Sequence, residues 1–173
     1  RRFIHNCRNT NKIRNPILTT GELNDSLFSI IRMVQQLEFT EDWNLLSQNK
    51  TLPNKSKILT LNPFMDEHNL IRVGGRLKNS ALSNDAKYPI LLPKNGVVTK
   101  LLIQQEHERH LHAGPQGTLA ALRQRFWIVS ARSAIRQVLH YCYSCFRVNP
   151  TNLKFKMGDL PAPRVQPARP FVV

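Results

Sequence analysis

Two pairs of metal-ligand side chains lie in the second half of the chain. His107 and His112 are followed, after a long spacer, by Cys142 and Cys145, in the pattern His-x4-His-x29-Cys-x2-Cys. Structural zinc takes four nitrogen or sulfur ligands in a tetrahedron, commonly from two local pairs. The pattern therefore predicts one structural Zn²⁺ bound by His107, His112, Cys142 and Cys145. All four ligands are protein groups, so no position would stay open for catalysis.

Other interpretations of these residues remain open at this point. His110 lies between the two histidines and competes with them as a ligand. The Cys-x2-Cys pair also suits two free core cysteines or a thiol oxidoreductase, which predicts a lowered thiol pKa. Redox pairs normally open a helix within an α/β unit, and no parallel-strand pattern precedes this pair. Four further candidates have no second pair at ligand spacing: His5, Cys7, His68 and His140.

Three helices must position the four ligands. Apolar spacing predicts a first helix from Val97 to about residue 111, which the Gly114-Pro115 pair ends. A second is expected over 118–127, with its apolar residues facing inward, and a third from Ser130 or Ser133 to about residue 141. The metal would then join the end of the first helix to the end of the third.

The segments ahead of these helices differ in character. Thr19 and Glu22 form a possible capping box, and apolar residues at helical spacing predict a helix to about residue 38. Thr40 could cap a shorter helix, and residues 47–57 have the composition of a linker. Residues 69–77 and 88–93 have strand-like patterns. The prolines around the second pattern favour an edge strand.

The predicted fold class is α+β, mainly helical: a three-helix zinc-bound bundle preceded by a small antiparallel β unit and an N-terminal helical segment. No apolar stretch is long enough for a membrane span, so no membrane partner is expected. The expected organisation is an N-terminal helical and linker segment (1–57), a β extension (58–96), a zinc-binding domain (97–149) and a proline-rich basic linker (150–173).

The net charge of +14 is unevenly distributed over the 173 residues. Residues 109–173 carry ten Lys or Arg against one acid, whereas residues 16–108 carry ten of each. This excess predicts a polyanionic partner, because phosphate contacts release condensed counterions; solubility alone is the alternative. Three cysteines, an odd number, indicate a reducing compartment. The candidate phosphate contacts are Arg123, Arg125, Arg132, Arg136, Lys154 and Lys156.

The zinc motif and its flanks resemble a known family. The runs HERHLHAGPQGTL (107–119), LRQRFWI (122–128) and CYSC (142–145) resemble the zinc-binding N-terminal domain of retroelement integrases. The flanking runs are similar to polyproteins of Bel/Pao-class long-terminal-repeat retrotransposons: NPFMDE (62–67), LIRVGGRL (70–77), PILLP (89–93) and MGDLP (157–161).

The resemblance implies a zinc-bound helical bundle that helps integrase multimerise and engage the DNA ends of the element, in a cytoplasmic particle and in the nucleus. His107, His112, Cys142 and Cys145 match the ligands of the family. Strand transfer needs three carboxylates, and only Asp159 follows the motif, so this chain is not expected to be an enzyme. The alternative is a zinc-folded protein-interaction and oligomerisation module without direct DNA binding.

Overall fold

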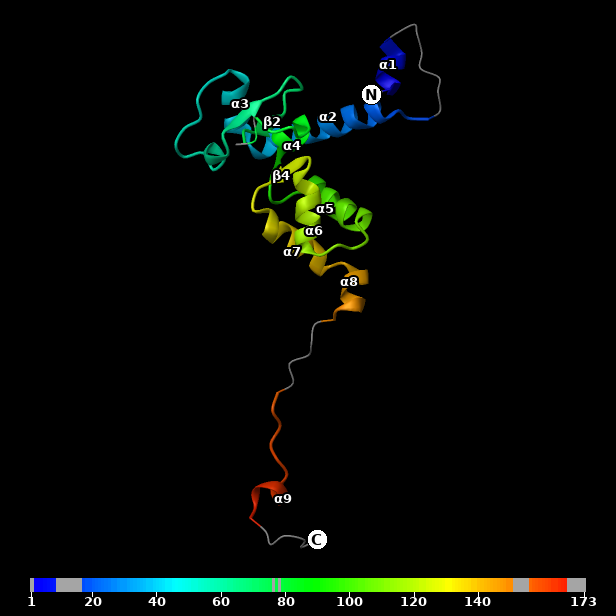
Figure 1. Cartoon of the computed structure of the whole chain (residues 1–173), viewed down its shortest axis with the longest axis vertical. Coiled ribbons are helices and arrows are strands. Elements are labelled where there is room, and N and C mark those ends of the chain that lie inside the picture. Colours follow the sequence, from blue (N-terminus) through cyan, green and yellow to red (C-terminus); the bar gives the residue numbers. More distant parts are fainter. Residues whose placement is uncertain (1, 9–16, 76, 78, 151–155, 168–173) are drawn as a thin grey trace.

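The computed structural model describes residues 2–8, 17–75, 77, 79–150 and 156–167 (Figure 1). The helices are α1 (Arg2–Arg8), α2 (Thr20–Glu38), α3 (Thr40–Ser47), α4 (Asn84–Lys87), α5 (Val97–Arg109), α6 (Pro115–Arg123), α7 (Ala131–His140), α8 (Tyr143–Val148) and α9 (Ala162–Val165), with a 3-10 turn at Leu59–Leu61. The strands are β1 (Pro63–Met65), β2 (Ile71–Val73), β3 (Ile90–Leu92) and β4 (Phe126–Ile128). The predicted class, α+β and mainly helical, is confirmed.

The long N-terminal helix begins as its sequence predicts. The Glu22 N–H donates to the Thr19 hydroxyl (3.3 Å), and the Thr19 N–H donates to the Glu22 carboxylate (2.9 Å), which completes the capping box of α2. Thr40 is the first residue of α3 rather than its cap, and its hydroxyl donates back to the Gln36 carbonyl of α2 (2.7 Å). No helix of the described ranges is both long and apolar enough to cross a membrane.

The sheet differs from the predicted antiparallel unit. Its strand order is β1-β2-β3-β4, and β3 pairs in parallel with β4, in the register Ile90↔Phe126. The second predicted helix therefore ends at Arg123, and the chain then turns into β4 instead of continuing helically through Trp127. The prediction of an edge strand at 88–93 is also wrong. Ile90–Leu92 are buried throughout, and β3 lies between β2 and β4.

Two apolar clusters lie against opposite faces of this sheet. Ile90 and Leu92 belong to the larger cluster and Leu91 to the smaller one, as the alternation of side chains along a strand requires. The smaller cluster includes side chains from α3. The larger cluster joins the sheet to the helices of the zinc motif through Leu102, Ile103, Leu119, Leu122, Phe126, Ile128 and Ile135.

Helix α2 is part of the same core. Ile31 is fully buried in the larger cluster. The buried Gln35 side chain donates to the carbonyls of Ile71 (3.0 Å) and Leu91 (2.7 Å), and it accepts from the Ile71 N–H (2.8 Å). The side chain thus bonds backbone groups of both β2 and β3. These two strands pair with each other through a single residue pair, Arg72↔Ile90. The segment ahead of the zinc motif is therefore packed against it.

Candidate metal centre

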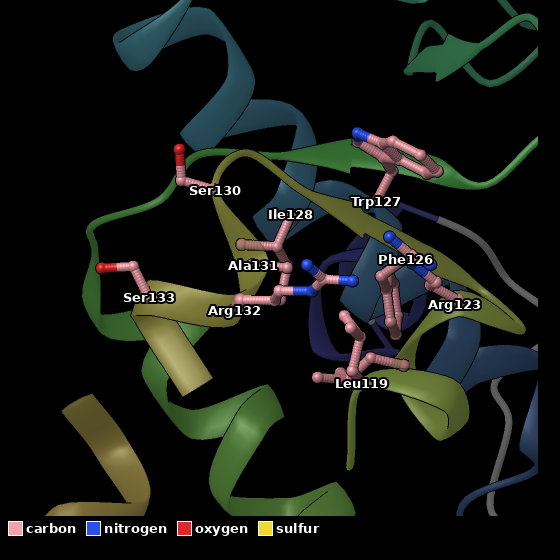
Figure 2. Close-up of a pocket in the computed structure, with 10 residues that line it drawn as sticks. Leu119, Arg123, Phe126, Trp127, Ile128, Ser130, Ala131, Arg132 and Ser133 are labelled. Atoms are coloured by element: carbon pink, nitrogen blue, oxygen red, sulfur yellow. The ribbon is translucent and has the colours of Figure 1, made fainter. Parts of the chain in front are cut away.

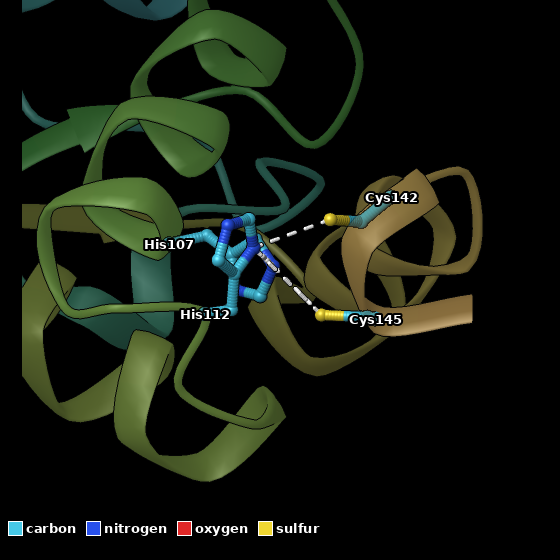
Figure 3. Close-up of side chains that lie close together, drawn as sticks. All are labelled: His107, His112, Cys142 and Cys145. Atoms are coloured by element: carbon cyan, nitrogen blue, oxygen red, sulfur yellow. Dashed lines mark hydrogen bonds between the residues drawn. The ribbon is translucent and has the colours of Figure 1, made fainter. Parts of the chain in front are cut away.

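The four predicted ligands converge at one end of the helical part (Figure 3). His107 lies in the last turn of α5, and His112 follows in the loop before α6. Cys142 is the residue before α8, and Cys145 lies within that helix. Their ligand atoms all lie within 4.8 Å of one another. The end of α5 is therefore joined to the end of α7, as the sequence predicts.

The separations between ligand atoms fit a single zinc ion. His107 Nε2 lies 3.2 Å from both His112 Nδ1 and Cys145 Sγ. His112 Nδ1 lies 3.3 Å from Cys142 Sγ and 3.9 Å from Cys145 Sγ. Tetrahedral zinc with ordinary bond lengths to nitrogen and sulfur separates its ligands by roughly 3.3–3.8 Å. Two nitrogens and two sulfurs at this spacing form a site for one structural Zn²⁺.

The ring of His107 is oriented by a carbonyl group. Its Nδ1 lies 2.9 Å from the Ala113 carbonyl oxygen; since a carbonyl only accepts, Nδ1 carries the proton and Nε2 is left to bind the metal. The Thr118 hydroxyl donates to the same carbonyl (3.1 Å), and Thr118 is fully buried. Such outer contacts fix the tautomer and orientation of a ligand. Thr118 follows Ala113 by five residues, but nothing in the sequence alone indicates that its hydroxyl bonds the Ala113 carbonyl.

His112 reaches the site through an unusual turn. Leu111 (φ 53°) and His112 (φ 61°) are both in the left-handed region, which non-glycine residues rarely adopt. The His112 N–H donates to the His107 carbonyl (2.9 Å), which folds the loop back over the end of α5. The Leu111 side chain is 90% exposed. Strained backbone of this kind persists where the surrounding structure fixes it. Here the left-handed conformation turns His112 toward the other ligands.

The competing interpretations of these residues lose support. His110 is outside the cluster, and its Nε2 lies 3.3 Å from a Glu106 carboxylate oxygen. Partial burial raises the pKa of the Cys145 thiol, and the neighbouring Cys142 side chain raises it further. Cys142 and Cys145 are free thiols, and the ligand cluster accounts for both.

The candidate phosphate contacts are dispersed rather than gathered in one patch. Arg125 is half-buried and donates to Asn24 Oδ1 (2.8 Å) of α2. Arg136 lines a cavity beside the zinc ligands, whereas Arg123 and Arg132 line a separate cavity next to β4. Lys156 is exposed, and Lys154 lies outside the described residues.

The helical region matches one known protein family. Residues 95–151 match the family of the integrase zinc binding domain. This match contains all four ligands. No curated protein and no solved structure matches the chain. With four protein ligands, the site within residues 95–151 has the ligand set of a structural rather than a catalytic zinc site.

Proposed function

We propose that this chain is the zinc-stabilised accessory part of a Bel/Pao-class retrotransposon integrase, which engages the DNA ends of the element and supports multimer assembly. The observation that carries this proposal is the coincidence of the family match at 95–151 with a complete His-His-Cys-Cys cluster. The flanking runs at 62–67, 70–77, 89–93 and 157–161 support the narrower Bel/Pao assignment. The complex would act in a cytoplasmic particle and in the nucleus.

Charge supports the DNA-binding part of the proposal. Residues 97–150 contain seven Lys or Arg and two acids, Glu106 and Glu108. Both acids lie on the last turns of α5, where Glu106 faces Arg109 (3.7 Å) and His110 (3.3 Å). The basic residues of α6 and α7 therefore have no acidic neighbours on their own helices. A surface of this kind attracts a polyanion at long range.

Exposed apolar side chains support the assembly part. Leu111 (90% exposed) and Val148 (87% exposed) lie on the rim of a cavity of about 740 Å³ beside Cys145. Phe146 lines the same cavity and is half-exposed. A contiguous exposed apolar surface is typical of a protein contact. We expect a second integrase copy to cover it.

Salt dependence tests DNA binding against the interaction-module alternative. Fluorescence anisotropy of the zinc-loaded chain with labelled DNA should show affinity that falls steeply between about 50 and 200 mM salt. Sedimentation at the same salt concentrations would report self-association. Self-association through an apolar contact should change little with salt. Concentration-dependent multimers without DNA binding at any salt would favour the interaction module.

A further inference from the structure

Beside β4 lies a cavity that the zinc site does not use. It has a volume of about 350 Å³ and lies between the end of α6, strand β4 and the first turn of α7 (Figure 2). Its floor is apolar and formed by Leu119, Leu122, Phe126 and Ile128, which are at most 5% exposed. Figure 2 shows the side chains of Arg123 and Arg132 on the rim, extending toward Phe126. No acidic residue lines it.

The two rim arginines are available to a ligand. Within the described part of the chain, no carboxylate forms an ion pair with Arg123 or Arg132, whereas Arg2, Arg72 and Arg109 each have such a partner. The Arg123 guanidinium lies 5.2 Å from the centroid of the Trp127 ring, a contact that restricts its position while leaving its N–H groups free to donate. Two unpaired guanidinium groups at one apolar cavity favour an anion with several acceptor oxygens.

The outer edge of β4 adds backbone donors. The Ile90 N–H donates to the Arg125 carbonyl and the Val129 N–H to the Leu92 carbonyl, so residues 125, 127 and 129 face β3. The N–H groups of Phe126 and Ile128 therefore point away from β3. Among the described strands β4 has no neighbour on that side. Phe126 and Ile128 also line the cavity.

Charge and strand length decide between an anionic strand of nucleic acid and an added peptide strand. Strand addition relies on a ladder of main-chain hydrogen bonds, and β4 has three residues, of which two face outward. A phosphodiester chain instead gains most of its affinity from arginine contacts and counterion release. The low polarity of the floor strengthens a charge-assisted hydrogen bond formed above it.

We propose that this cavity binds the phosphate backbone of a DNA strand, held by Arg123 and Arg132. The inference rests on the proposed function and makes it more specific. Of the four candidate arginines, it assigns two to one phosphate-binding site. It leaves Arg125 a packing role, because Arg125 is bonded to Asn24 and lies over the rings of Phe28 and Phe126. It gives Arg136, on the zinc side, no part in this site.

The test compares two double variants of the zinc-loaded full chain. R123A/R132A removes both rim charges, and K94A/K100A removes two exposed charges at a different cavity, between α5 and α7. We expect R123A/R132A to weaken binding of labelled duplex DNA about tenfold and to lower the salt slope by about two. K94A/K100A should change affinity less than about twofold. Equal zinc content and circular dichroism would show that both variants are folded.

The outcomes separate this inference from the function on which it rests. If both double variants lose the same affinity, the cavity is not the phosphate site, although DNA binding itself stands. If the unmodified chain binds no DNA at any salt, the proposed function fails first. Polyglutamate that competes with DNA as strongly as unlabelled DNA does would overturn the inference in favour of an acidic peptide.

A spectroscopic measurement gives a second readout. In a W43F background, Trp127 is the one remaining tryptophan and lies against Arg123. Phosphate binding at the rim should change its emission when DNA is added, and R123A/R132A should abolish that change. An emission change that persists in R123A/R132A would contradict the proposed site.

Discussion

The sheet end and the zinc end of the folded region are stabilised by different means. At the sheet end, where α2 meets β2 and β3, Ile31, Leu70 and Ile90 are fully buried and Gln35 bonds the strand backbones. At the zinc end, formed by loop 110–114, α8 and the four ligands, no residue of α8 is buried, and Tyr143 is 72% exposed. A six-residue helix has no stability of its own in water.

This difference shows how a metal replaces apolar burial. Structural zinc contributes on the order of 10 kcal/mol in small zinc-folded peptides, whereas burying one large apolar side chain contributes roughly 1.5–3 kcal/mol. The zinc end has four ligands and few buried side chains, so the metal dominates its stability. The sheet end depends on packing and on buried hydrogen bonds. Each end should therefore respond to a different perturbation.

The largest expected effect is at the zinc end. C145S, or chelation of the unmodified chain, should reduce bound zinc from one ion to none. Hydrogen exchange should then become fast in loop 110–114 and α8, while α2 and β3 keep their protection, because they belong to the apolar core. Native mass spectrometry measures the bound zinc, and hydrogen-exchange mass spectrometry measures the protection of each segment. H110A is the matched control and should retain zinc; a zinc-free H110A would mean that the ligand set is wrong.

The second effect is at the sheet end. Q35L removes three hydrogen bonds of a buried amide and leaves groups of β2 and β3 unsatisfied, which should lower the free energy of unfolding by roughly 2–4 kcal/mol. Urea unfolding in excess zinc measures it. Q36L, at a partly exposed neighbouring position, should stay within about 0.5 kcal/mol. A stability loss in Q35L no larger than in Q36L would show that the amide does not join the strands.

A smaller effect should follow from Thr118. T118V keeps the shape of this buried side chain but removes the hydroxyl that donates to the Ala113 carbonyl. Because that carbonyl orients His107, zinc affinity should fall about tenfold, the lower end of losses for outer-shell contacts. Competition with a chromogenic chelator measures the affinity. T118S, which restores the hydroxyl, should recover most of the loss, and an unchanged affinity in T118V would remove Thr118 from the site.

The smallest effect is at the start of α2. The Arg2 side chain, followed by the Thr19 backbone N–H, lowers the pKa of Glu22 to about 2. The charged form is favoured in the folded state, so this contribution is fully present above about pH 4.5 and is lost as the pH falls toward 2. An NMR titration of the Glu22 carboxyl measures the pKa directly. R2A should raise it, with zinc binding unchanged, and a value near 4.5 in the unmodified chain would contradict the contact.

Local patterns were sufficient for much of the molecule. The ligand set follows from residue types and spacing, and the capping box of α2 follows from Thr19 and Glu22. Helices α5 and α7 follow from apolar periodicity close to their observed bounds. In each of these cases the physical cause acts within a few turns of the chain, or between groups that a single ion draws together.

Tertiary contacts decided the rest. Phe126–Ile128 is a short apolar run whose pattern suits a helix or a strand, and its parallel pairing with β3 made it a strand. That same pairing turned the proline-flanked run Ile90–Leu92 into an interior strand. Gln35 became a core residue through a bond to Leu91, 56 positions away. Pairings over such distances depend on the packing of the whole core, which local sequence does not encode.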